Sequence, residues 1–194
     1  GAVRERASLT RPERELSDDA LRAMAIMFSD LDGPETLDAM LMERGDPPYA
    51  HMLYEALGDL YIEKERYQDA ALAYEAFARR RPEDRYAPSL QMRSIAAYEK
   101  GGFASLVLDG KQAFVERYAF GSAFWRRRAM ADAPEVVAQL KSNQQDLAEY
   151  HHARAQKTGQ AEHYAAAVRW RRAMLESFPD DQEAPQTRYL LAEA

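Results

Sequence analysis

Apolar and aromatic residues recur at intervals of three and four along most of the chain, which predicts helices rather than strands. The pattern is clearest between residues 51 and 82, where it defines two helical stripes. The first stripe is Tyr54, Leu57 and Tyr61, and the second is Ala70, Tyr74 and Phe77. Glu65-Arg66 is a short polar joint between them, and Pro82, which has no N–H to donate, ends the second helix. This stretch therefore predicts an antiparallel helical hairpin.

Seven positions of this hairpin match the signature of a tetratricopeptide repeat (TPR). They are Tyr54, Leu57, Gly58, Tyr61, Ala70, Tyr74 and Pro82. Gly58 and Ala70 are small where two helix backbones must approach each other, and the aromatic residues fill the space around them. The chain thus resembles the TPR superfamily. The resemblance implies an all-α fold in which antiparallel hairpins stack into a solenoid, an α-α superhelix with a right-handed turn. It also implies binding of partners along the concave face.

The rest of the chain divides into similar units. Residues 1–16 lack helical periodicity and are expected to form a flexible lead-in, with Ser17 as the N-cap of the first helix. Residues 17–194 predict a single helical-repeat domain. Its expected parts are a degenerate hairpin at 17–46, the best repeat at 51–84, a divergent repeat at 86–118, a long-helix repeat at 134–180 and the start of a further repeat at 185–194. Residues 119–133 predict a loop with a short helical turn around Phe124-Trp125.

One sequence pattern between two predicted helices occurs twice in the chain. The spacing Pro82-x-Asp84-x-x-Ala87-Pro88 recurs as Pro179-x-Asp181-x-x-Ala184-Pro185, so both places are expected to end one repeat and begin another. The last residues then begin a helix without its partner. This favours a segment of a longer repeat protein over a terminal cap. The second junction resembles those of bacterial Tol-Pal accessory proteins and outer-membrane assembly lipoproteins, which implies the periplasm or cell envelope rather than the cytoplasm.

Composition narrows the class of protein further. The chain has 194 residues, a formal net charge of −6 and no cysteine. The negative charge argues against nucleic acid as the main ligand, and the absence of cysteine excludes disulfides and thiolate metal sites. No apolar run reaches the roughly 18–20 residues that a membrane-spanning helix needs.

Candidate chemistry is sparse. His151 and His152 are adjacent and point to different sides of a helix, and Glu149-x-x-His152 has no second copy to complete a di-iron site. Asp30-x-Asp32-Gly33 begins like a calcium loop but lacks the later acidic ligands. No grouping typical of a nucleophile, a phosphate loop or paired catalytic carboxylates occurs. We therefore expect no enzyme activity, no cofactor and no metal.

Partner binding is the function that the sequence favours. In the TPR superfamily, the first helix of each repeat lines the concave face. The resemblance places five residues of 51–64 in those positions, namely Met52, Glu55, Asp59, Ile62 and Glu63. Family members that grip a C-terminal carboxylate have Lys or Asn where this chain has Glu55 and Asp59. A basic or neutral-hydrophobic peptide therefore fits better. Equally, these acids could serve only to keep the surface soluble.

A second candidate patch combines an aromatic residue with a basic run. It consists of Trp125, Arg126, Arg127 and Arg128, where an acidic or phosphate-bearing partner could dock. The functional hypothesis is a non-catalytic scaffold that binds a protein or peptide. The alternative is a purely structural repeat segment that packs against other repeats of its own chain.

Overall fold

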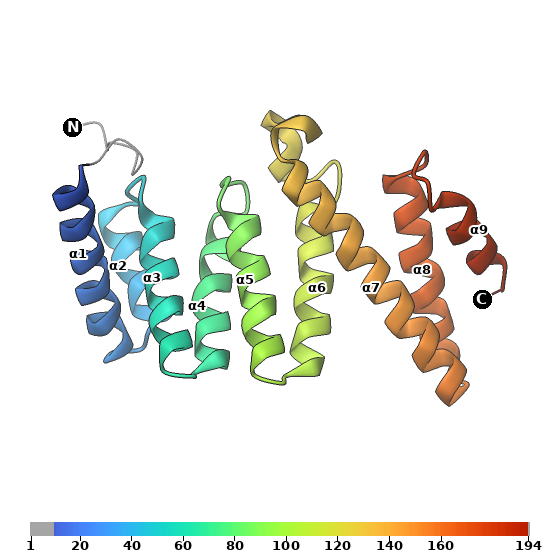
Figure 1. Cartoon of the computed structure of the whole chain (residues 1–194), viewed down its shortest axis with the longest axis horizontal. Coiled ribbons are helices and arrows are strands. Elements are labelled where there is room, and N and C mark those ends of the chain that lie inside the picture. Colours follow the sequence, from blue (N-terminus) through green and yellow to red (C-terminus); the bar gives the residue numbers. More distant parts are fainter. Residues whose placement is uncertain (1–9, 194) are drawn as a thin grey trace. The chain divides into compact units, whose positions relative to one another are not determined.

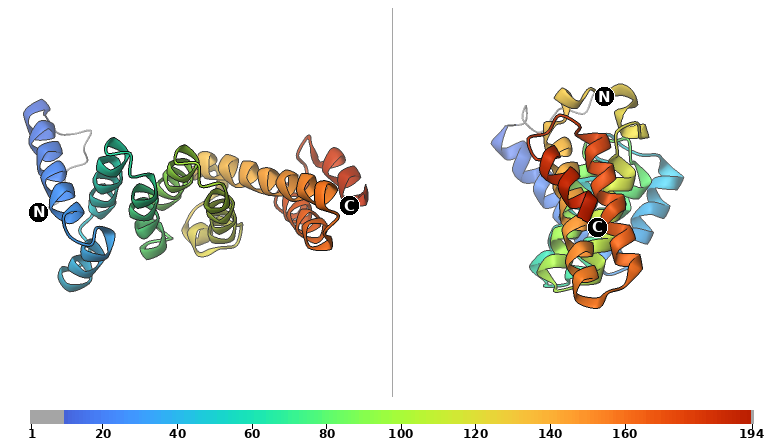
Figure 2. Two further views of the ribbon diagram at one scale, coloured as in Figure 1. Left: turned by 90° about the horizontal axis from the view of Figure 1, so that it is seen from below. Right: turned by 90° about the vertical axis from the view of Figure 1, so that its right-hand side faces the viewer.

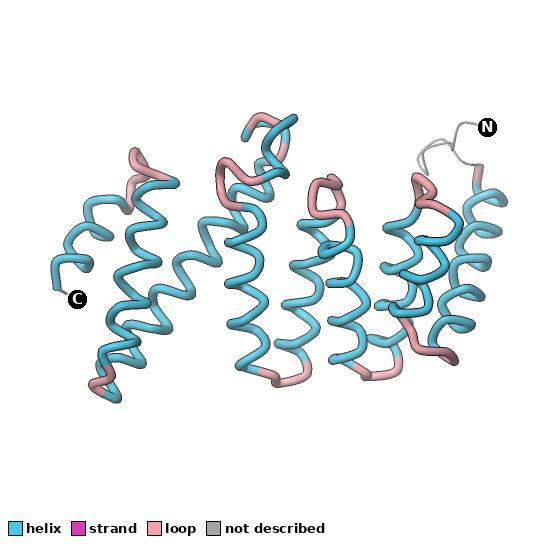
Figure 3. Tube along the Cα trace, turned by 180° about the vertical axis from the view of Figure 1, so that it is seen from behind, coloured by secondary structure: helices cyan, strands magenta, loops and turns pink. Residues whose placement is uncertain are grey.

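The computed structural model describes residues 10–193, with side chains described to residue 191, and all its regular elements within that range are helices (Figure 3). The all-α expectation is thereby confirmed. The chain divides into two compact units, one ending at Val107 and the other beginning at Leu108. The sequence had predicted one domain over 17–194. Each unit is described by itself below.

The first unit contains five complete helices. They are α1 (Arg11–Ser29), α2 (Pro34–Arg44), α3 (Ala50–Glu63), α4 (Tyr67–Arg80) and α5 (Ala87–Lys100). In Figure 1, α1, α3 and α5 run in one direction and α2 and α4 run in the other. Helix α3 packs on α1 and on α4, and α4 packs on α5. The first helices of successive helix pairs therefore lie on one side of the unit.

Helix α1 begins seven residues earlier than the sequence predicts, because its N-cap is Thr10 rather than Ser17. Thr10 precedes it, and the backbone N–H of Thr10 donates to the Glu13 carboxylate at 2.8 Å. This contact satisfies one N–H at the helix start, and it lowers the pKa of Glu13. Ser17, expected as the N-cap, instead lies inside α1, so residues 11–16 are helical. Residues 1–9 of the expected lead-in lie outside the described range.

The predicted hairpin of residues 51–82 is present as α3 and α4. All of its predicted apolar positions are buried, from Tyr54 on α3 to Phe77 on α4. Gly58 lies directly against Tyr74, so close that a Cβ on Gly58 would stand 2.2 Å from the ring atom Cε1. A glycine is therefore required where α3 meets the aromatic ring of α4.

The second unit holds the rest of α6 (Ala104–Tyr118), which begins in the first unit, and the helices that follow. These are the 3₁₀ turns η2 (Ala123–Arg127) and η3 (Met130–Asp132), then α7 (Pro134–Thr158), α8 (Ala161–Ser177) and α9 (Ala184–Glu193). The helical turn expected around Phe124 is confirmed as η2. Helix α8 packs on α7 and on α9 (Figure 2). Gly159 ends α7 in the left-handed conformation, with φ of 68°, which costs glycine little.

The echoed sequence junctions have the same local structure. At the first, the Asp84 carboxylate accepts a hydrogen bond from the backbone N–H of Tyr86 at 2.9 Å, and α5 begins one residue later. At the second, Asp181 accepts from the N–H of Glu183 at 2.9 Å, and α9 begins one residue later. In both turns an aspartate satisfies a backbone donor that the coming helix cannot. A new helix therefore begins at both places, which the expected repeat boundaries require.

Candidate functional site

A groove lies between α1 and α3 in the first unit, with a volume of about 300 Å³. Helix α3 contributes residues on its outer face from Met52 to Glu63, and α1 contributes residues from Asp18 to Ala25. The full lining is Asp18, Leu21, Arg22, Ala25, Met52, Glu55, Ala56, Asp59, Leu60 and Glu63. The groove thus combines an apolar floor with carboxylates and a single guanidinium.

Four of the five predicted partner-binding residues line this groove, and Ile62 does not. The structure therefore brings Met52, Glu55, Asp59 and Glu63 together along one face of α3. Leu21, Ala25 and Leu60 are buried in the floor, whereas Met52 and Ala56 are half-buried and leave apolar atoms open to the groove. A ligand could therefore make apolar contact at Met52 and Ala56 and ionic contact at the carboxylates.

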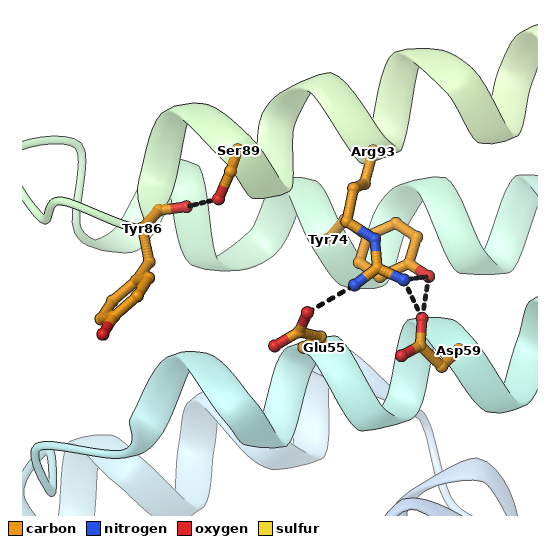
Figure 4. Close-up of polar contacts among 6 residues, drawn as sticks. All are labelled: Glu55, Asp59, Tyr74, Tyr86, Ser89 and Arg93. Atoms are coloured by element: carbon orange, nitrogen blue, oxygen red, sulfur yellow. Dashed lines mark hydrogen bonds and ion pairs between the residues drawn. The ribbon is translucent and has the colours of Figure 1, made fainter. Parts of the chain in front are cut away.

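Glu55 and Asp59 are held by Arg93 of α5 (Figure 4). One guanidinium nitrogen donates to Glu55 Oε1 at 2.6 Å, and the other donates to Asp59 and, at 3.0 Å, to the Tyr74 hydroxyl. The guanidinium also stacks over the Tyr74 ring, 4.5 Å from its centre. Tyr74 in turn donates to Asp59 at 2.6 Å, and burial together with this bond raises the pKa of Tyr74. These side chains link α3, α4 and α5 into one network.

Glu63 is paired on the other side of the groove, with Arg22 of α1. The guanidinium donates to both carboxylate oxygens, at 3.1 Å and 2.9 Å, and these contacts lower the pKa of Glu63. The side chains of Arg22 and Glu63 are 59% and 53% exposed, so water competes for both partners. The three acids that the sequence analysis placed on this face, Glu55, Asp59 and Glu63, are thus all paired with arginines of neighbouring helices.

Sequence reasoning identified the α3 half of the site and missed Arg22 and Arg93. These arginines stand 41 and 34 residues from their partners Glu63 and Asp59. No local motif marks these two arginines. The pairs form because α3 packs on α1 and contacts α5, which makes charges on their exposed faces neighbours in space.

The second candidate patch is partly used for packing. Trp125 donates its indole N–H to the carbonyl of Tyr118 at 2.8 Å and rests against Phe120 and Phe124. Arg128 stacks over the Phe124 ring, 4.4 Å from its centre, and donates to the Phe124 carbonyl. Arg126 and Arg127 remain exposed. Trp125 and Arg128 therefore stabilise the 119–133 segment through these contacts, and both stay half-buried.

The histidines do not build a metal centre within the described residues, where no group of three or more potential ligands converges. His51 stacks on Tyr86 with ring centres 3.7 Å apart, and His152 contacts Arg171 at 3.3 Å. His151 and His163 meet between α7 and α8, with their Nδ1 atoms 3.0 Å apart. The Asp30–Gly33 segment forms the turn between α1 and α2, where the Gly33 N–H donates to the Phe28 carbonyl.

No helix within residues 10–193 is both long enough and apolar enough to cross a membrane. Comparison of the chain with models of known protein families and with curated protein sequences finds no match.

Proposed function

We propose that this chain is a non-catalytic, TPR-like scaffold that binds a protein segment in the groove between α1 and α3. The segment presents arginine or lysine together with apolar side chains. The observation that carries the proposal is the groove itself, in which four carboxylates surround half-buried Met52 and Ala56. A cationic, amphipathic ligand would complement both the charge and the apolar floor.

The helix arrangement supports a repeat scaffold. Helices α1, α3 and α5 run in one direction along one side of the first unit, as the first helices of stacked hairpins would. We propose that this side is the concave face of a solenoid. Met52, Ala56 and Glu63 recur at four- and seven-residue spacing, so they share one face of α3 and can contact one ligand.

A second candidate function follows from Arg93. Its contacts with Glu55 and Asp59 tie α3 to α5, and Arg22 similarly ties α1 to Glu63. On this hypothesis the acids only join neighbouring helices, and the chain is a structural repeat segment. The two functions differ in whether the groove takes a foreign ligand.

The test uses a substitution that fills the groove without removing a residue of either ion-paired network. Ala56→Arg places a long side chain in the groove, while Ala96→Arg adds the same side chain to the exposed face of α5 and serves as the matched control. The probe is an acetylated and amidated helical peptide of about twelve residues, which matches the roughly 17 Å of α3 from Met52 to Glu63. It carries leucine and arginine on one face, and a second peptide carries glutamate in place of arginine.

We expect the arginine peptide to bind the native chain and the Ala96→Arg variant equally, and to bind Ala56→Arg at least tenfold more weakly, as measured by fluorescence anisotropy. The glutamate peptide should bind none of them, because the carboxylates repel it. Equal binding to Ala56→Arg and Ala96→Arg would place the ligand elsewhere. Failure of the arginine peptide to bind any form would favour the structural role.

A further inference from the structure

We infer that an arginine of the ligand binds Glu63 in place of Arg22. Arg22 therefore competes with the ligand for this carboxylate within the chain. This inference rests on the proposed function and specifies its ligand. It follows from a comparison of the two arginines that now neutralise Glu55, Asp59 and Glu63, because a cation that binds these carboxylates competes with one arginine or the other.

Arg93 is the harder of the two to displace. Its guanidinium contacts two carboxylates and a hydroxyl, and it stacks on a buried aromatic ring. Its side chain is 37% exposed. A ligand that displaced Arg93 would have to replace all of these contacts at once, and would expose the face of Tyr74.

Among the described residues, Arg22 is held by one exposed partner. Glu63 accepts two hydrogen bonds from the Arg22 guanidinium, and both side chains are more than half exposed. Exposed ion pairs of this kind stabilise a protein little, so a ligand cation with additional apolar contacts can replace Arg22. Met52 and Ala56, on the same face of α3, offer those contacts.

The geometry at Glu63 selects the kind of cation. Its two oxygens each accept from a different nitrogen of Arg22, so the carboxylate is presented to a planar fork of donors. A ligand arginine reproduces both contacts, whereas a lysine ammonium, a compact point charge, does not match this paired geometry. The structure therefore assigns an arginine-bearing segment, rather than a merely basic one, as the occupant.

The experiment compares the arginine peptide with a peptide in which lysine replaces each arginine. Both are titrated against the native chain and against Arg22→Gln, Glu63→Gln and the double variant. Arg79→Gln removes the same charge from the exposed face of α4 and serves as the control. Arg22 and Arg79 are both on the surface, so we expect these variants to fold, and circular dichroism verifies that each one does.

We expect Arg22→Gln to tighten binding of the arginine peptide about threefold, and Arg79→Gln to leave it unchanged. Glu63→Gln should weaken binding and abolish the gain from Arg22→Gln. The lysine peptide should bind several-fold more weakly than the arginine peptide to the native chain and to Arg22→Gln.

The inference is wrong if Arg22→Gln does not raise the affinity for the arginine peptide, or if Arg79→Gln raises it equally. It is also wrong if the arginine and lysine peptides bind with equal affinity. Any of these results, with binding still sensitive to Ala56→Arg, would leave the proposed function standing. If Ala56→Arg does not weaken binding of the arginine peptide, both the proposed function and this inference are wrong.

Discussion

At the scale of single residues, small and aromatic side chains fix how close two helices can lie. Tyr54 donates its hydroxyl to Asp38 of α2, and burial together with this bond raises the pKa of Tyr54. Tyr74 fills the space left by Gly58 and is itself fixed by Asp59 and Arg93. The aromatic rings are therefore packed at one end and hydrogen-bonded at the other, which leaves no room for an additional atom.

Gly58→Ala should destabilise the first unit although alanine is the better helix former. The new Cβ would lie 2.2–2.6 Å from three atoms of the Tyr74 ring, which is 1% exposed and cannot move aside. Such overpacking typically costs 1–3 kcal/mol, against a gain of up to about 1 kcal/mol in helix propensity. We expect a net loss of about 1 kcal/mol in the free energy of unfolding, measured by urea denaturation.

The matched test of this explanation is Tyr74→Leu, which removes the ring. In that background, Gly58→Ala should cost clearly less than in the native chain, because the clash has lost its partner. If the cost of Gly58→Ala is the same in both backgrounds, the ring is not its cause.

At the scale of helices, the sequence predicted most boundaries because the signals that end helices are local. Pro34, Gly101-Gly102 and Gly159 fall at helix limits where expected. The start of α1 was placed wrongly at Ser17, although Thr10-x-x-Glu13 is a capping pattern that could have marked it. Apolar periodicity could not show this start, because the residues between Thr10 and Ser17 are largely polar.

The site was predictable only in part, for a physical reason. Repeat spacing placed Met52, Glu55, Asp59 and Glu63 on one face, and the structure puts them in one groove. Their neutralisation by Arg22 and Arg93 depends on which helices lie side by side. Spacing within one hairpin contains no information about that.

The pairing of α7 with α8 should respond to pH through His151. Burial, followed by the nearby His163 and Arg169, lowers the pKa of His151, so the folded chain holds this ring neutral. As pH falls through the ordinary histidine value of about 6.5, the unfolded chain takes up a proton at His151 more readily than the folded chain does. Stability should therefore fall on acidification from pH 7.5 to 5.5, above the range in which carboxylates titrate.

His151→Gln should flatten this pH dependence, measured as the difference in melting temperature between pH 7.5 and 5.5. The exposed Gln156 of α7 offers the control, since Gln156→His adds a histidine that is solvated in both states and should leave the dependence unchanged. His51, whose pKa burial also lowers, contributes in the same direction and should account for the slope that remains. An unaltered slope in His151→Gln would contradict the prediction.

At the scale of the whole molecule, the chain divides between residues 107 and 108 into two units that can differ in stability. Each unit buries its own apolar residues, including Leu57 and Tyr74 in the first and Leu140 and Leu147 in the second. In helical arrays, stability is approximately a sum of local and nearest-neighbour contributions. The effect of a core substitution should therefore decline with distance along the chain.

Native-state hydrogen exchange would show this decline directly. Gly58→Ala should reduce protection of the amides in α3, α4 and α5 and change those in α8 little. Leu140→Ala leaves a cavity in α7, where such truncations cost about 2–5 kcal/mol, and should reduce protection in α7 and α8 while sparing α3. If either variant lowered protection equally in every helix, the chain would unfold as one cooperative unit, and the expected decline with distance would be wrong.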